Sequence, residues 1–143
     1  MNDPAREARR WILQAKDDLR FVEWVRAEGA FFDKACFLSQ QAGEKALKAC
    51  LYGLGRRRVL GHSLIELLED LASEVPEATA LQRAAARLDR YYISTRYPNG
   101  LPGGCPYQAY SAEDLEQAHQ DAAQVVEFAQ RFLEARGILE AGE

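Results

Sequence analysis

Residues 37–49 read FLSQQAGEKALKA, and this stretch decides the fold of the chain. It lies within a helix that the residue pattern predicts over about 33–54. Small or apolar residues fall on two sides of that helix. One side carries Ala35, Leu38, Ala42 and Ala49, and the other carries Cys36, Gly43, Leu47, Cys50 and Leu54. A helix with apolar residues on more than one side needs cover on each of them, so we expect this helix at the centre of a bundle.

Gly43 lies inside the predicted central helix. A glycine in a helix interior costs about 1 kcal/mol relative to alanine. A close crossing by another helix would compensate for that cost, so the glycine predicts one at this position.

The flanking segments have the three- and four-residue apolar spacing of further helices. We expect long helices over about 5–27, 77–93 and 112–136, and a shorter one from Ser63 to just before Pro76. Ser63 and Glu66 have the spacing of a capping box. The predicted fold is all-α: one up-and-down bundle of about five helices, four long and one short, in a single domain over residues 1–143.

Residues 94–110 contain three prolines and three glycines, so we expect no helix there. A loop of this length in a small domain is unusual and tends to be functional. Tyrosines gather around it: Tyr91, Tyr92, Tyr97, Tyr107 and Tyr110. They either anchor the loop by packing or offer rings for base stacking.

The charge balance is slightly acidic, with 22 Asp and Glu against 18 Lys and Arg and a net charge of −4. This excludes a uniformly basic nucleic-acid-binding domain but leaves room for a local basic patch. No apolar run is long enough for a membrane span, and the first residues do not have the pattern of a signal peptide. Three cysteines without a CxxC pair fit a reducing compartment, so we expect a cytoplasmic protein.

Common catalytic and cofactor-binding motifs are missing from the sequence. There is no Gly-rich phosphate loop, no HExxH pair and no GxSxG elbow. Two histidines and three scattered cysteines do not form a zinc-binding set. We therefore expect no metal and no cofactor, and a binding role more than an enzymatic one.

Four short motifs follow one another along the chain. Residues 37–49 are followed by GHSL at 61–64, LDRYYI at 88–93 and TRYP at 95–98. In this order they resemble the HEPN domain, over about residues 8–133. The resemblance implies a helical bundle, a homodimer, and a minimal nucleotidyltransferase as partner in a toxin–antitoxin-like pair. It also implies that a tyrosine hydroxyl is a candidate acceptor for a nucleotidyl group.

Some HEPN proteins are metal-independent ribonucleases with an Arg-x(4–6)-His motif near the fourth helix. Arg96 has no histidine at that spacing after it. Arg57 and His62 have the spacing, as do Arg56 and His62, but they lie in the loop after the central helix. Our leading interpretation is therefore binding of a nucleotide or RNA. The alternatives are a ribonuclease toxin that uses the displaced pair Arg57 and His62, and a non-catalytic protein-interaction module.

The predicted nucleotide-binding residues combine cations for phosphate with rings for bases. They are Gln41, Lys45, Lys48, His62, Asp89, Tyr92, Arg96 and Tyr97. His62 stands beside a helix N-terminus, which favours anions. Asp89 is expected to hold Arg96 while the guanidinium binds a phosphate.

Each of these residues also has a purely structural interpretation. Lys48 follows Glu44 at i,i+4 and can form an ordinary ion pair on a helix surface. His62 can pack at the start of the helix that follows it. Asp89 and Arg96 can orient each other while Tyr92 packs between helices, and Arg56, Arg57 and Arg58 can form a solvated loop.

Overall fold

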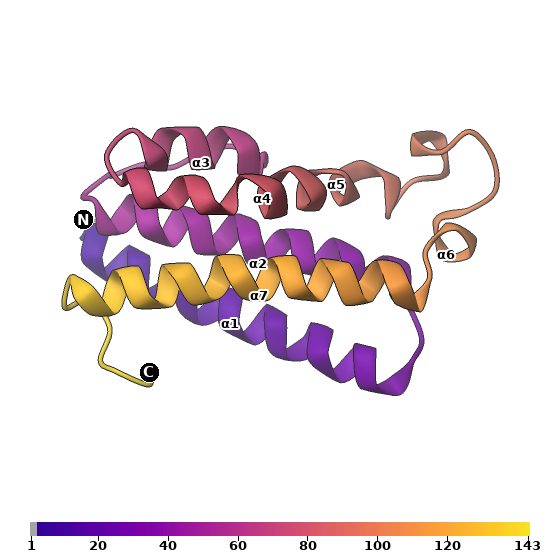
Figure 1. Cartoon of the computed structure of the whole chain (residues 1–143), viewed down its shortest axis with the longest axis horizontal. Helices are drawn as coiled ribbons and strands as arrows, with labels where there is room; N and C mark the ends of the chain where they lie inside the picture. Colours follow the sequence, from indigo (N-terminus) through magenta and orange to yellow (C-terminus); the bar gives the residue numbers. More distant parts are fainter. Residues whose placement is uncertain (1–2) are drawn as a thin grey trace.

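The central helix α2 (Phe32–Gly53) contacts almost every other part of the bundle. The structure is a computed structural model that describes residues 3–143. Helices α1 (Pro4–Glu28) and α7 (Ala112–Ala135) pack on α2, and α3 (Leu64–Ala72) and α4 (Gln82–Asp89) cover it from a further side (Figure 1). The described residues contain no strand. The prediction of an all-α bundle of helices is confirmed.

The core confirms the central position of α2. Its buried residues come from both predicted sides, and Cys36, Leu47, Cys50 and Leu51 have no exposed surface. Burial raises the pKa of the Cys36 thiol to about 12, so Cys36 is a packing residue rather than a nucleophile.

Gly43 lies at a close helix crossing, as its place in the sequence predicts. A Cβ atom at this position would lie 2.7 Å from Leu64 Cδ2 and 3.0 Å from Leu88 Cδ1. The first leucine belongs to α3 and the second to α4. The missing side chain therefore lets both helices approach α2.

Two helix boundaries differ from the prediction. Helix α2 begins at Phe32 after Phe31, whose backbone is left-handed with φ of 57°, so Asp33 stands inside the first turn. The helix expected over 77–93 has three parts: the 3-10 helix η1 (Pro76–Leu81), α4, and the short α5 (Tyr91–Ser94). The break falls at Arg90, whose N–H donates to the carbonyl of Arg87 instead of continuing the α-helical pattern.

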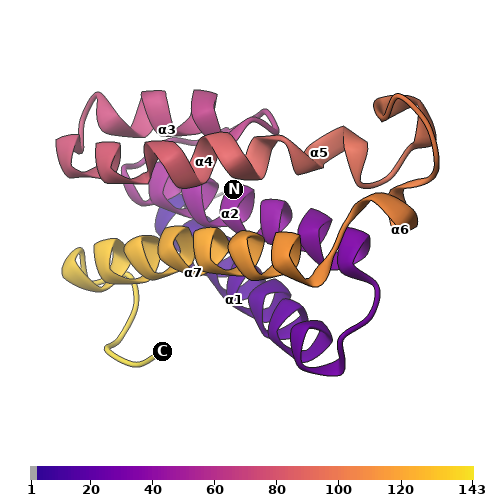
Figure 2. The same cartoon turned by 45° about the vertical axis from the view of Figure 1, so that its right-hand side comes forward.

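The proline- and glycine-rich loop has more structure than we predicted. It contains the 3-10 turn η2 (Pro98–Gly100) and one helical turn, α6 (Pro106–Ala109). The hydroxyls of Tyr110 and Ser94 form a hydrogen bond, and the Tyr110 ring meets Tyr91 edge to face at 5.9 Å. The loop extends beyond one end of the bundle in both views (Figures 1 and 2).

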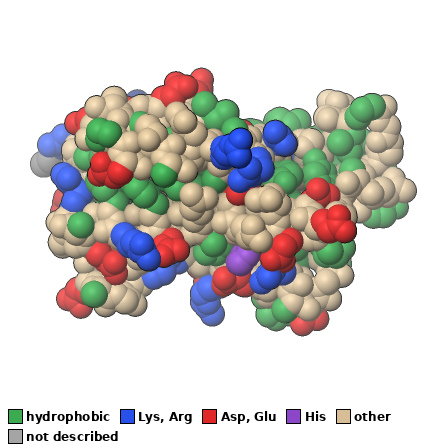
Figure 3. Space-filling view, in the orientation of Figure 1, with side chains coloured by type: hydrophobic (Ala, Val, Ile, Leu, Met, Phe, Trp, Pro, Cys, Tyr) green, Lys and Arg blue, Asp and Glu red, His purple; other side chains and the backbone are tan. Residues whose placement is uncertain are grey.

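Charges are interspersed on the face of the molecule that carries α7 (Figure 3). One strong pair joins α7 to α4, where Arg87 donates two hydrogen bonds of 2.8 Å to the buried carboxylate of Asp121. No helix within residues 3–143 is long and apolar enough to span a bilayer.

The crossing at Gly43 makes a prediction about stability. We expect Gly43→Ala to lower the free energy of unfolding in urea by about 1–2 kcal/mol, because overpacking outweighs the gain in helix propensity. The control is the same change in a Leu64→Ala background, where the closer contact is removed and the Leu88 side chain can shift into the vacated space. There Gly43→Ala should be neutral or stabilising, and an equal loss in both backgrounds would contradict the close crossing.

Candidate functional site

The guanidinium of Arg96 lies among three aromatic rings. Its central carbon is 4.5 Å from the ring centre of Phe37, 4.6 Å from that of Tyr92 and 5.0 Å from that of Tyr97. Its Nε donates a 2.7 Å hydrogen bond to the carbonyl of Tyr92. Within residues 3–143 Arg96 has no carboxylate partner. The rings and the carbonyl therefore orient the guanidinium and leave its terminal nitrogens for a ligand.

His62 lies on the same surface. Its ring stacks on Tyr92 with centres 5.0 Å apart and planes 17° apart, and its side chain is 61% exposed. The Nδ1 atom of His62 also lies 3.3 Å from Glu44 Oε1. We call the set Phe37, His62, Tyr92, Arg96 and Tyr97 the Arg96 surface.

Glu44 connects the Arg96 surface to the interior of the bundle. One carboxylate oxygen faces His62, and the other is 3.2 Å from the ammonium of Lys48. Lys48 is almost fully buried, and its ammonium also lies 5.2 Å from the ring centre of Trp11. The Glu44–Lys48 pair at i,i+4 is present, but it is buried rather than on the helix surface. The structure therefore places Lys48 behind the Arg96 surface, not on it.

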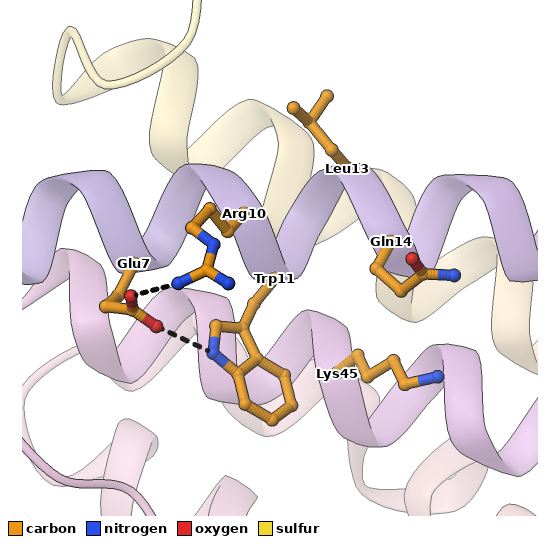
Figure 4. A pocket seen from close by; sticks show the side chains of 6 residues that line it. All are labelled: Glu7, Arg10, Trp11, Leu13, Gln14 and Lys45. Atoms are coloured by element: carbon orange, nitrogen blue, oxygen red, sulfur yellow. Dashed lines mark hydrogen bonds and ion pairs between the residues drawn. The ribbon is translucent and has the colours of Figure 1, made fainter.

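Lys45 lies in a different place, the groove between α1 and α2 (Figure 4). Its ammonium pairs with the carboxylate of Asp18. The groove has a volume of about 610 Å³ and is lined by Glu7, Arg10, Trp11, Leu13, Gln14 and Lys45. No hydrogen bond or ion pair among the described residues joins Lys45 to His62 or Arg96.

Gln41 is linked to the Arg96 surface through hydrogen bonds of its neighbour Gln40. Its Nε2 donates a 2.8 Å hydrogen bond to Gln40 Oε1, and Gln40 Nε2 donates a 3.0 Å hydrogen bond to the carbonyl of His62. Gln40 is fully buried, so this amide fixes the backbone of His62 against α2.

We expected Asp89 to hold Arg96, and this prediction is wrong. Its carboxylate accepts hydrogen bonds from the Ser63 hydroxyl at 2.8 Å, the Leu64 N–H at 2.7 Å and the Ile65 N–H at 3.1 Å. Ser63 itself caps α3 by accepting from the Glu66 N–H. The first N–H groups of a helix have no partner within it, so a carboxylate from another helix is a strong cap.

The displaced pair of the ribonuclease alternative is not assembled. Arg56 pairs with Asp70 at 2.7 Å and Glu74 at 2.6 Å. Arg57 is exposed, and within residues 3–143 it forms no ion pair or side-chain hydrogen bond. The arginine that lies near His62 is Arg96, because both side chains contact the ring of Tyr92.

The whole bundle matches one known domain. The sequence profile of the HEPN domain matches residues 8–135, from the first turns of α1 to the end of α7. The chain belongs to the HEPN domain family. The sequence resemblance stated above is thereby confirmed.

Solved structures of similar sequence have the same HEPN fold. TT1696 of Thermus thermophilus is 37% identical, with a TM-score of 0.78 over 87% of this chain and 97% of that one. ST0689, an archaeal HEPN homologue, is 29% identical, with a TM-score of 0.73 over 93% and 99%. An HEPN domain protein of Thermotoga maritima, tm0613, is 33% identical, with a TM-score of 0.67 over 87% and 98%.

A curated relative carries a functional name. The protein named "Putative toxin MJ1304", of Methanocaldococcus jannaschii, is 27% identical in an alignment of 137 residues that covers 90% of this chain and 90% of that one. The similarity therefore extends over nearly the whole length of both chains.

Three residues of the candidate site were missed in the sequence. Phe37, Gln40 and Glu44 support Arg96 and His62, but none was among the predicted ligand residues. The available signal was the helical spacing of 37, 40, 41 and 44, which places them along one side of α2. No group of three or more His, Cys, Asp or Glu within the described residues is arranged to hold a metal.

Four of the five tyrosines around the loop fall into two kinds. Tyr91 and Tyr110 pack against each other, and burial raises the pKa of Tyr91 to about 12. Tyr97 and Tyr107 are exposed, by 49% and 67%. The loop is therefore anchored by one pair of rings and presents another pair to solvent.

The role of Asp89 can be tested by stability alone. We expect Asp89→Ala to lower the free energy of unfolding by about 1–3 kcal/mol, because three donors at the start of α3 lose their acceptor. Its neighbour Arg90 is exposed and provides the control, since Arg90→Ala should change stability by no more than about 0.5 kcal/mol. Wild-type stability of Asp89→Ala in chemical denaturation would contradict the cap.

Proposed function

We propose that this HEPN protein binds RNA or a nucleotide at the Arg96 surface. One observation supports this most directly: Arg96 is held by three rings and a carbonyl, yet its terminal nitrogens have no carboxylate partner among residues 3–143. A guanidinium presented in this way suits the two-oxygen geometry of a phosphate. The exposed rings of His62 and Tyr97 beside it suit base stacking.

A cleft next to Arg96 has room for part of the ligand. It has a volume of about 440 Å³ and is lined by Asp33, Lys34, Phe37, Leu38, Thr95, Arg96, Pro98, Pro106 and Tyr107. Lys34 adds a second, exposed cation, although Asp33 pairs with it at 3.0 Å. The cleft and the Arg96 surface share Phe37 and Arg96, so one ligand can occupy both.

The biological role that we propose is one half of a toxin–antitoxin-like pair in the cytoplasm. The name of the Methanocaldococcus relative supports a toxin-like role. The HEPN family further suggests a homodimer and a minimal nucleotidyltransferase as protein partner. A tyrosine that accepts a nucleotidyl group from this partner must be accessible, and Tyr97 and Tyr107 are exposed.

RNA cleavage is the second candidate, and the contact between Glu44 and His62 favours it. A carboxylate on one imidazole nitrogen orients the ring, so that the other nitrogen can take a proton. In this reaction the 2′-hydroxyl of RNA loses its proton to His62 and attacks the adjacent phosphorus. The bond from phosphorus to the 5′-oxygen breaks, and this oxygen takes a proton from solvent. Arg96 would stabilise the charge that develops on the phosphate.

Binding can be tested with a fluorescein-labelled single-stranded RNA of mixed sequence in fluorescence polarisation at fixed salt. We expect Arg96→Ala to raise the Kd at least about tenfold, because a charge-assisted contact to phosphate is lost. Arg83→Ala is the matched control, since Arg83 is an exposed arginine on α4 outside the Arg96 surface. Equal Kd values for wild type and Arg96→Ala would remove Arg96 from the site.

The same RNA separates binding from cleavage. Incubation with EDTA followed by gel analysis should show intact RNA if the protein only binds, and fragments with a 2′,3′-cyclic phosphate if it cleaves. In the second case we expect His62→Ala to abolish the fragments even at protein concentrations that saturate the RNA, which separates lost chemistry from the weaker binding that loss of the stacking ring causes. Cleavage that persists in His62→Ala would exclude His62 as the proton acceptor.

A further inference from the structure

Helix α1 exposes large apolar side chains on the side that faces away from the bundle. Leu13, Phe21 and Trp24 are 39%, 46% and 62% exposed, and the rings of Phe21 and Trp24 lie 6.5 Å apart. Helices α2 and α7 cover the opposite side of α1, which lies at one edge of the molecule (Figure 2). Leu13 points away from α2 (Figure 4). Exposed apolar side chains gathered on one helix face commonly mark an interaction surface.

Seven of the exposed side chains of α1 have a symmetric spacing along the helix. They are Arg6, Arg10, Leu13, Asp17, Phe21, Trp24 and Glu28, and we call this set the α1 outer stripe. Steps of three and four residues keep all seven on one face of a helix. The steps are 4, 3, 4, 4, 3 and 4, so the order is the same from either end, with Asp17 in the middle.

Such a stripe fits an antiparallel copy of itself. With the two-fold axis at Asp17, Leu13 of one copy faces Phe21 of the other. Arg10 then faces the ring of Trp24, an arrangement that suits a cation–π contact. Arg6 faces Glu28, so the stripe ends in opposite charges.

The charges of α1 select this direction of pairing. In residues 4–16 basic side chains outnumber acidic ones, with Arg6, Arg9, Arg10 and Lys16 against Glu7. In residues 17–28 acidic side chains outnumber basic ones, with Asp17, Asp18, Glu23 and Glu28 against Arg20 and Arg26. A parallel pair would bring the three arginines of both copies together. Asp17 meets its own copy at the axis, but each Asp17 has an ion pair of 3.1 Å with Arg20 of its own helix. Within residues 3–143 neither Arg6 nor Glu28 forms an ion pair, so both are free to pair across the axis.

We propose that the α1 outer stripe is the dimer surface of this protein, and that its occupant is α1 of a second copy in antiparallel orientation. The inference rests on the homodimer proposed above and adds the surface and its register. A two-fold interface uses the same surface on both subunits, which a stripe of symmetric spacing satisfies. The groove of Figure 4 shares Arg10 and Leu13 with the stripe and extends the contact toward α2.

Charge reversal with rescue tests the register. We expect light scattering after size exclusion, at low salt, to give twice the chain mass for the wild type. Arg6→Glu and Glu28→Arg each create two like-charge contacts per dimer, so each should weaken the dimer about tenfold. The double variant Arg6→Glu/Glu28→Arg should recover the wild-type mass. Glu69→Arg, on the exposed side of α3, is the control for a charge change elsewhere.

Cross-linking tests the axis. In a Cys105→Ser background the remaining cysteines, Cys36 and Cys50, are buried. Asp17→Cys should then form a disulfide between copies on mild oxidation, because position 17 faces itself. Glu69→Cys in the same background should stay uncross-linked.

The outcomes separate this inference from the proposed function. A dimer that is unaffected by both single reversals and does not cross-link at position 17 would overturn the α1 surface and leave RNA binding as it is. A monomeric wild type would overturn both the dimer and its surface. RNA binding is measured separately by polarisation, and its absence in a cross-linked dimer would overturn the proposed ligand alone.

Discussion

The site depends on the hydrogen bonds of one carboxylate, that of Asp89. It accepts from the Ser63 hydroxyl and from the Leu64 and Ile65 N–H groups, and it thereby ties the end of α4 to the start of α3. His62 directly precedes Ser63, and its carbonyl is held from α2 by Gln40. The two anchors, one from α2 and one from α4, fix the backbone at and next to His62. The imidazole can therefore stack on Tyr92 although its side chain is mostly exposed.

Different sides of helix α2 contribute to the core and to the candidate site. Its small residues let α3 and α4 approach closely, most of all at Gly43. Glu44 follows directly, with one carboxylate oxygen toward buried Lys48 and the other toward His62. A buried ammonium needs a partner, because desolvation of an unpaired charge is strongly unfavourable. The carboxylate that meets this need also orients the imidazole, so the core and the site share one group.

The proposed ligand surface and the proposed dimer surface lie on different parts of the chain. The Arg96 surface is made by α2, the start of α3, and the segment from α5 to Tyr97. The outer stripe lies on α1 and shares no residue with it. A line of contacts leads from His62 through Glu44 and Lys48 to Trp11. This line reaches α1 at Trp11, which is not part of the outer stripe, so each surface can be altered by substitutions that leave the other intact.

Patterns within single elements were predictable. The apolar sides of α2 predicted its central position, Gly43 predicted the close crossing, and Ser63 predicted a helix start. Local hydrogen bonds changed the boundaries at Phe31 and Arg90, since neither residue carries a signal that distinguishes a helix from a turn. The candidate site was predictable only as a set of residue types. Four of the predicted residues do come together, because the motifs that contain them flank the same side of α2: His62, Tyr92, Arg96 and Tyr97. Three others pair with groups of the protein itself: Lys45, Lys48 and Asp89.

The sequence by itself determined the all-α bundle, because periodicity and small residues dictate which helix faces are buried. Only the tertiary structure decided which charges are free. A lysine or aspartate on a helix has the same sequence pattern whether it faces solvent or a partner. The partner comes from a distant part of the chain, as with Lys45 and Asp18 or Asp89 and the start of α3. A buried charge needs a partner of opposite charge beside it. The packing of whole helices, and not the neighbours in the sequence, determines which residue that partner is.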